Sequence, residues 1–145
     1  MKFGDQLRSS IIKEYEWYYI AYDELKDELN NNNSESYSRK PSKNTQKPWT
    51  ENNETKFLAR LESELDRVYT KQKVKALEIS RRILNSEVEV REVTARLEAE
   101  VDPPSEEEFM MLEEDLSDII ADVHDLAKFV QLNYTGFQKI IKKHD

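Results

Sequence analysis

The fold is decided by one long stretch, FLARLESELDRVYTKQKVKALEISRRILNSEVEVREVTARLEAEV, which spans residues 57–101. This stretch contains neither Gly nor Pro, the two residue types that most often interrupt a helix. Its apolar residues recur at steps of three and four, from Leu58, Leu61 and Leu65 onward to Leu97, which places them on one helical face. The stretch therefore predicts a single helix of roughly 65 Å, which needs partner helices to cover its apolar face.

Signals at both ends delimit this helix. Thr50 is a favourable N-cap residue, and Glu54 in the first turn complements the positive end of the helix dipole. Asp102-Pro103-Pro104 ends the helix, and Ser105 with Glu108 forms a capping box that begins a returning helix. The returning helix is expected to direct a set of apolar residues inward: Phe109, Leu112, Leu116, Ile119, Ile120, Val123, Leu126, Ala127 and Val130.

Shorter helices are predicted on either side of these two. Residues 3–15 and 20–30 each carry apolar residues at helical spacing, and together they form a helical hairpin. The aromatic run at residues 17–19 is expected to plug the corner of this hairpin against the core. Residues 133–136, Asn-Tyr-Thr-Gly, interrupt the pattern of the returning helix, so that Thr135 caps a short last helix containing Phe137, Ile140 and Ile141.

The predicted fold class is therefore all-α, with an N-terminal helical hairpin packed on an elongated three-helix bundle and a short C-terminal helix. A length of 145 residues predicts one domain, residues 1–145. Residues 31–49 are rich in Asn, Ser, Lys and Pro and nearly free of apolar side chains, so they predict a flexible loop within that domain.

Composition excludes several classes of site. The chain has no Cys, which excludes disulfides and thiolate metal sites. Its two His residues, His124 and His144, have no partners at metal-ligand spacing, and its two Gly residues form no glycine-rich phosphate loop. We find no arrangement of residues typical of catalysis. The sequence therefore predicts no catalytic residue, no metal and no cofactor, and a chain that is not itself an enzyme.

Charge is distributed unevenly along the chain. The net charge is −8, which argues against a general nucleic-acid-binding protein. Residues 98–125 hold twelve Asp and Glu and no Lys or Arg, whereas residues 126–145 hold four Lys and one Asp. An acidic chain with a basic end favours an anionic ligand or partner at that end.

Lysines at helical spacing are the candidate ligand residues. Lys139, Lys142 and Lys143 lie at positions i, i+3 and i+4 and share one helical face, where a ligand with several phosphates relieves their mutual repulsion. Tyr22 and Lys26, at i and i+4, form a second pair of hydrogen-bond donors. Lys2, beside the free backbone N–H groups that begin the first helix, is a third candidate.

Spacing alone leaves a plainer interpretation open for each of these residues. A lysine-rich helix end also suits the negative end of the helix dipole, and a surface Tyr often packs on a Lys stem. Under that interpretation the lysines are incidental, and the chain is a coiled-coil-like module for protein interaction, with the long helix as its surface.

Several stretches of the sequence resemble the SPX domain. These are MKFG at residues 1–4, YIAYDELK at residues 19–26 and LNYTGFQKIIKKHD at residues 132–145. They occur in the order of the family and span the whole chain. The stretch DLSDIIADVHDLAKF, residues 115–129, is similar to SPX domains attached to a fungal polyphosphate polymerase.

The resemblance implies a function. SPX domains sense inositol polyphosphates and inositol pyrophosphates, whose levels report cellular phosphate status. The matching positions are Tyr22, Lys26 and Lys142 for a phosphate-binding cluster and Lys139 and Lys143 for an adjoining lysine surface, with Lys2 and Phe3 bordering the site. The resemblance further implies regulation of an attached polyphosphate polymerase, contacts with other subunits of its complex, and a location on the cytosolic face of the vacuolar membrane.

Overall fold

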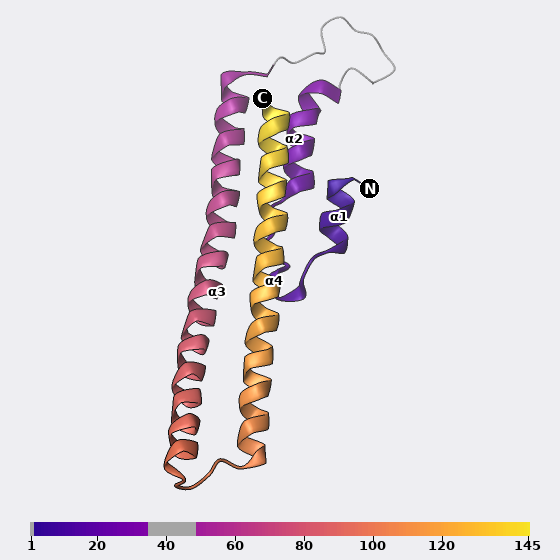
Figure 1. The fold of residues 1–145 in the computed structure, drawn as a ribbon. Coiled ribbons are helices and arrows are strands. Elements are labelled where there is room, and N and C mark those ends of the chain that lie inside the picture. The colour runs from indigo at the N-terminus through magenta and orange to yellow at the C-terminus, as the bar shows by residue number, and fades with distance from the viewer. Residues whose placement is uncertain (1, 35–48) are drawn as a thin grey trace, which may run out of the picture. The chain divides into compact units, whose positions relative to one another are not determined.

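The computed structural model describes residues 2–34 and 49–145, and within these ranges all regular elements are helical (Figure 1). They are α1 (Phe3–Ser9), the 3₁₀ turn η1 (Lys13–Tyr15), α2 (Tyr22–Ser34), α3 (Glu51–Ala99) and α4 (Glu106–His144). The predicted all-α class is confirmed. Of the predicted loop 31–49, residues 31–34 belong to α2, which corrects that boundary, and residues 35–48 lie outside the described part.

The helices form two compact units. The first contains Met1–Lys71 and Phe129–Asp145, and the second contains Gln72–Lys128. In the first unit, α1, η1 and α2 accompany the early turns of α3 and the last turns of α4, whereas the described elements of the second unit are α3 and α4 alone (Figure 1). In the second unit, therefore, the described part of the chain forms a two-helix pair and not the predicted three-helix bundle.

The ends of the two long helices follow the predicted caps. The backbone N–H of Asn53 donates to the hydroxyl of Thr50 over 3.1 Å, which confirms Thr50 as the N-cap of α3. Ser105 and Glu108 exchange hydrogen bonds of 3.2 Å, so the capping box before α4 is confirmed as well. Between the helices Glu100 and Asp102 adopt left-handed backbone angles, with φ of 52° and 43°, which reverse the chain direction.

The first predicted helix is too long by six residues. Helix α1 ends at Ser9, and Ile11, an apolar residue within the predicted helix 3–15, is 42% exposed. Tyr15 is nevertheless fully buried, because its ring stacks on Phe129 of α4 at a centroid distance of 4.6 Å. The burial of Tyr15 therefore comes from its contact with Phe129 and not from one continuous helix over residues 3–15.

The predicted aromatic plug is correct only in part. Trp17 is 76% exposed, whereas Tyr19 is buried and meets the Phe129 ring edge-on at 5.0 Å. Tyr15 and Tyr19 therefore fill the corner from two sides of one ring, and Trp17 remains outside.

A separate C-terminal helix is not present, because α4 continues through residues 133–136 to His144. Gly136 has a packing role instead of a helix-ending one: a Cβ added there would stand 2.8 Å from Ile20 Cγ2 and 3.4 Å from the ring of Phe3. One glycine costs a helix interior only about 1 kcal/mol, which the neighbouring helical residues tolerate. Gly136 thereby allows the segment before α2 to approach α4 closely.

The returning helix buries fewer residues than predicted. Ile119 is buried, but Phe109, Leu116 and Ile120 are 42%, 39% and 58% exposed. In the second unit the described residues supply α3 as the neighbour of α4, and one neighbour covers only part of an apolar face. An exposed apolar surface on α4 results.

Candidate functional site

Phe3 connects three segments that are far apart in the sequence. Its ring meets the Tyr22 ring edge-on with the centroids 4.9 Å apart, and Lys139 Nζ lies 5.8 Å from the centroid of the Phe3 ring. Phe3 and Tyr22 are buried, and Lys139 is exposed. Three of the predicted site residues thus lie next to one another, with Phe3 between Tyr22 and Lys139.

Tyr22 is held as a neutral phenol. Burial, with the nearby Asp23 carboxylate as a second cause, raises the pKa of Tyr22 above its ordinary value of 10.0. A neutral phenol retains its O–H, and it therefore remains a hydrogen-bond donor at any physiological pH.

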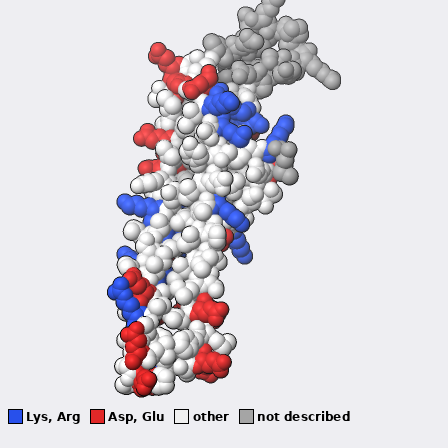
Figure 2. Space-filling view, in the orientation of Figure 1, with Lys and Arg blue, Asp and Glu red and all other residues white. Residues whose placement is uncertain are grey.

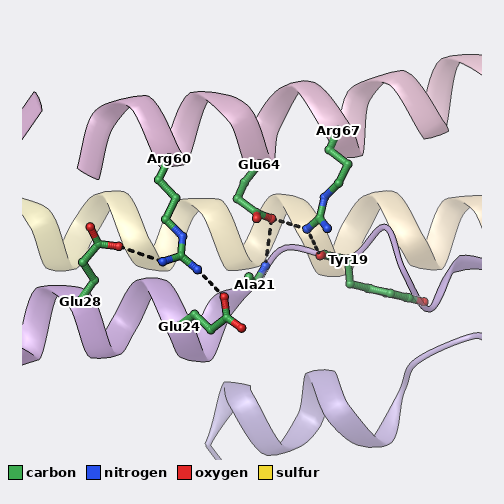
Figure 3. A network of polar contacts seen from close by, with 7 residues as sticks. All are labelled: Tyr19, Ala21, Glu24, Glu28, Arg60, Glu64 and Arg67. Carbon is green, nitrogen blue, oxygen red and sulfur yellow. Dashed lines mark hydrogen bonds and ion pairs between the residues drawn. The ribbon is translucent and has the colours of Figure 1, made fainter. Parts of the chain in front are cut away.

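The start of α2 is fixed by bonds from two long helices. The Ile20 N–H donates to Asn133 Oδ1 of α4 over 2.7 Å, and the Ala21 N–H donates to Glu64 Oε2 of α3 over 3.2 Å. Arg67 donates to the Tyr19 carbonyl over 2.9 Å and pairs with Glu64 (Figure 3). The backbone groups that form these bonds belong to the three residues directly before Tyr22, so the bonds together determine where α2 begins.

Helix α2 is also tied to α3 by an arginine. Arg60 pairs with Glu24 and Glu28, which lie one turn apart on α2 (Figure 3). At 100° per residue these carboxylates lie on the opposite side of α2 from Tyr22 and Lys26. The ion pairs therefore leave the Tyr22 and Lys26 face of α2 turned away from α3. Lys26 is half-buried on that face.

The last turns of α4 present three exposed lysines. Lys139, Lys142 and Lys143 are exposed, while Phe137 and Ile140 on the other side of the helix are buried. Within the described part of the chain, no carboxylate forms an ion pair with any of the three. Ile141, the third apolar residue of the predicted last helix, is 48% exposed and does not join Phe137 and Ile140 in the core.

Lys2 lies at the edge of this arrangement. It is the N-cap residue of α1, and its carbonyl accepts the backbone N–H groups of Asp5 and Gln6. Its side chain is exposed and makes no capping hydrogen bond. Lys2 directly precedes Phe3, so it borders the group formed by Phe3, Tyr22 and Lys139.

A second polar cluster, which the sequence analysis missed, closes the end of the first unit. His144 Nε2 lies 2.8 Å and 2.9 Å from the two carboxylate oxygens of Glu54, and the indole N–H of Trp49 donates to Glu54 over 2.6 Å. The His144 ring stacks on Phe57 with centroids 5.3 Å apart. The glutamate lies ninety residues before the histidine, so no local spacing signals the pair.

The two units differ strongly in charge. Residues 72–128 carry seven Lys and Arg against sixteen Asp and Glu, whereas the other residues of the chain carry fifteen against fourteen. Figure 2 shows basic side chains gathered beside the last turns of α4 and acidic side chains gathered around the connection between α3 and α4. The first unit is therefore the one suited to an anionic ligand.

The second unit contains an apolar groove of about 700 Å³. Both helices contribute to its lining: Ile83, Ser86 and Val90 come from α3, and Leu116, Ile119, Ile120 and Val123 come from α4. Glu87, Arg91 and His124 complete the lining and add a few polar atoms to it. A surface of this kind suits an apolar helix more than a charged small molecule.

No group of three or more His, Asp or Glu side chains in residues 2–34 and 49–145 is arranged to hold a metal ion. In the same ranges no helix combines the length and the apolar character needed to cross a bilayer.

In the first unit, therefore, an N-terminal segment, the start of α2 and a lysine-bearing helix end lie together. No protein-family model matches the chain. Curated proteins do: it is 46% identical over all of its 145 residues to vacuolar transporter chaperone complex subunit 4 of Schizosaccharomyces pombe. It is 34% identical to subunit 2 of the same organism and 32% identical to subunit 2 of Saccharomyces cerevisiae, again along its whole length.

The chain is therefore homologous along its whole length to a segment of vacuolar transporter chaperone complex subunits. It spans 18% of the length of each of the two S. pombe relatives and 16% of the S. cerevisiae relative.

Proposed function

We propose that this chain is a phosphate-status sensor domain that binds inositol polyphosphates and pyrophosphates. Tyr22, Lys26 and Lys142 form the phosphate-binding cluster, Lys139 and Lys143 form an adjoining lysine surface, and Lys2 and Phe3 border the site. The observation that carries the proposal is the contact of Phe3 with both Tyr22 and Lys139, which brings residues from α1, α2 and α4 to one place. Exposed lysines on α4, with Lys139 over the Phe3 ring and the neutral Tyr22 phenol on the other side of Phe3, are suited to a ligand with several phosphates.

The energetics favour a ligand with many charges. A hydrogen bond to a charged group contributes about 1.5–3 kcal/mol before ordering costs are subtracted. Several such contacts together reach about micromolar affinity once the entropy of association is included. Orthophosphate engages too few donors at once, so it binds poorly. The domain thereby distinguishes inositol polyphosphates from the phosphate that is abundant in cells.

The relatives suggest what the domain regulates. They are named as subunits of the vacuolar transporter chaperone complex. In our proposal a longer protein that contains this chain is a polyphosphate polymerase, and this domain, which has no catalytic role, controls it. Its partners are the attached catalytic domain and other subunits of the complex at the cytosolic face of the vacuolar membrane. Ligand binding changes how the domain contacts them.

The binding step is tested by calorimetry with inositol hexakisphosphate and, separately, orthophosphate at one moderate salt concentration. We expect about micromolar affinity for the first ligand and at least about a hundredfold weaker affinity for the second. Similar affinities for both would mean that single phosphate contacts dominate, which contradicts a sensor of inositol polyphosphates. The regulatory step is tested by polyphosphate synthesis in the longer protein with and without inositol hexakisphosphate.

A second candidate function, a module for protein interaction, is favoured by the apolar groove in the second unit. Its occupant would be an apolar helix of another subunit, because the relatives are named as subunits of a complex. The substitution Ile120→Glu separates the two candidates. It prevents assembly with partner subunits if the groove is the functional surface, and it leaves affinity for inositol hexakisphosphate unchanged in either case.

A further inference from the structure

The cluster around His144 connects the beginning of α3 with the end of α4. Glu54 lies in the first turn of α3, and His144 is the last residue of α4. One carboxylate accepts from the imidazole and from the Trp49 indole, while Phe57 stacks against the imidazole at an interplanar angle of 8°. The imidazole is therefore fixed in both position and orientation by residues from outside its own helix.

This cluster adjoins the candidate ligand residues. His144 directly follows Lys142 and Lys143, and all three belong to the last turn of α4. A helix turn is held in place most firmly where its side chains make tertiary contacts. The contacts of His144 with Glu54 and Phe57 supply such a hold, and they act on the turn that carries two lysines.

Among the described residues, carboxylates from two places face the imidazole. Glu54 approaches from α3, and Asp145 Oδ1 lies 3.4 Å from Nδ1. Trp49 and Phe57, which complete the contacts, are uncharged. A protonated imidazole donates from both nitrogens, whereas a neutral one donates from only one. Protonation thus allows both carboxylates to be engaged at the same time.

We propose that Glu54 and His144 form a proton-dependent clasp that positions Lys142 and Lys143, so that protonation of His144 increases the affinity of the domain for polyanions. The inference rests on the proposed function and adds a regulatory input to the same site. His144 acts as a positioning residue, through the helix turn that it holds, and its positive charge adds to the attraction for an anion.

The expected directions are consistent with the local electrostatics. The hydrogen bond to Glu54 is the main cause that raises the pKa of His144 above 6.5, and the same bond lowers the pKa of Glu54 below 4.5. The clasp is therefore complete between these two values and weakens as pH rises through the raised pKa of His144. By reciprocity, polyanion binding raises the pKa of His144 further. One additional charge near the ligand increases affinity by about three- to fivefold.

The probe for the test is inositol hexasulfate, because its sulfates keep their charge where the phosphates of inositol hexakisphosphate titrate. Calorimetry at about pH 6 and about pH 8 is expected to give about three- to fivefold tighter binding at the lower pH. Glu54→Gln, which keeps the size of the side chain but removes its charge, reduces that ratio, and His144→Gln removes it. The matched control is His124→Gln, which alters the other histidine of the chain and leaves the ratio unchanged.

A second measurement separates the clasp from the binding function. The His144 ring titration followed by NMR without ligand is expected to show a raised pKa that falls in Glu54→Gln. Binding that is equally tight at both pH values, or a His144 pKa that is insensitive to Glu54→Gln, overturns the clasp alone. Absence of binding to both the hexasulfate and inositol hexakisphosphate overturns the proposed function and the clasp with it.

Discussion

Replacing Asn133 by Ala removes a buried connection between α4 and the segment before α2. Asn133 is 1% exposed, accepts the Ile20 N–H at 2.7 Å and donates to the Phe129 carbonyl at 2.7 Å. The two bonds differ in importance. The Phe129 carbonyl lies inside α4 and keeps its helical partner, whereas the Ile20 N–H loses its acceptor in a buried position.

The expected loss of stability follows from that one orphaned donor. Leaving a buried N–H without a partner costs about 1–3 kcal/mol, and the lost packing of the amide adds about 1 kcal/mol. We therefore expect Asn133→Ala to lower the free energy of unfolding by about 2–4 kcal/mol. This is a large share of the roughly 5–15 kcal/mol that separates a folded domain from its unfolded state.

Urea denaturation followed by circular dichroism measures the loss, and hydrogen exchange at the Ile20 amide locates it. The matched control is Gln131→Ala, an exposed position two residues earlier on the same helix, which is expected to change stability by less than about 0.5 kcal/mol. If Asn133→Ala changed stability as little as the control does and left exchange of the Ile20 amide unaltered, the bond between Asn133 and Ile20 would not stabilise the fold, and the reasoning would be refuted.

Three further predictions concern packing, the arginine network and pH. Gly136→Ala is expected to destabilise the chain by about 1 kcal/mol in thermal unfolding, because the clash with Ile20 outweighs the gain in helix propensity; a stabilised variant would show that the gap can widen freely. Arg67→Met is expected to lower the free energy of unfolding by about 1–2 kcal/mol and to weaken inositol hexakisphosphate binding, since the Tyr19 carbonyl loses its donor. Unchanged affinity would show that the arginine network does not support the binding site. Because the pKa of His144 is raised and that of Glu54 is lowered, the contribution of the pair to stability is complete between their ordinary values of 4.5 and 6.5 and is lost as pH rises through the raised pKa of His144; His144→Gln should lack that loss in urea denaturation compared at about pH 6 and about pH 8.

Local signals in the sequence predicted the long helices well. A cap such as Thr50, or the box of Ser105 and Glu108, acts within a few residues, so its structure follows from neighbouring residue types alone. The absence of Gly and Pro over a long stretch is similarly local evidence. These signals determine where helices begin and end, and the all-α class follows from them.

Predictions that depended on tertiary contacts were less accurate. Gly136 suggested a helix end, yet its lack of a side chain allows Ile20 and Phe3 to approach α4. Tyr15 suggested a longer first helix, yet its burial comes from Phe129. In both cases a contact with a residue distant in sequence explains the residue type, and the periodicity of the sequence cannot reveal such a contact.

The candidate site shows the same division. Spacing on one helix grouped Lys139 with Lys142 and Lys143, and the structure leaves all three exposed. The position of Phe3 between Tyr22 and Lys139 required the fold. The pairing of Glu54 with His144 also required it, since the two residues lie ninety positions apart and no local spacing connects them.

The central claim is tested most directly by calorimetric titration of the chain and two double variants with inositol hexakisphosphate at fixed salt. We predict about micromolar binding by the unaltered chain, and loss of that binding in Lys26→Ala with Lys142→Ala. The matched variant Lys73→Ala with Lys128→Ala removes the same charge from exposed positions of the second unit and should bind nearly as well. Equal weakening in the two variants would show that net charge alone attracts the ligand, and it would contradict a site built from α2 and α4.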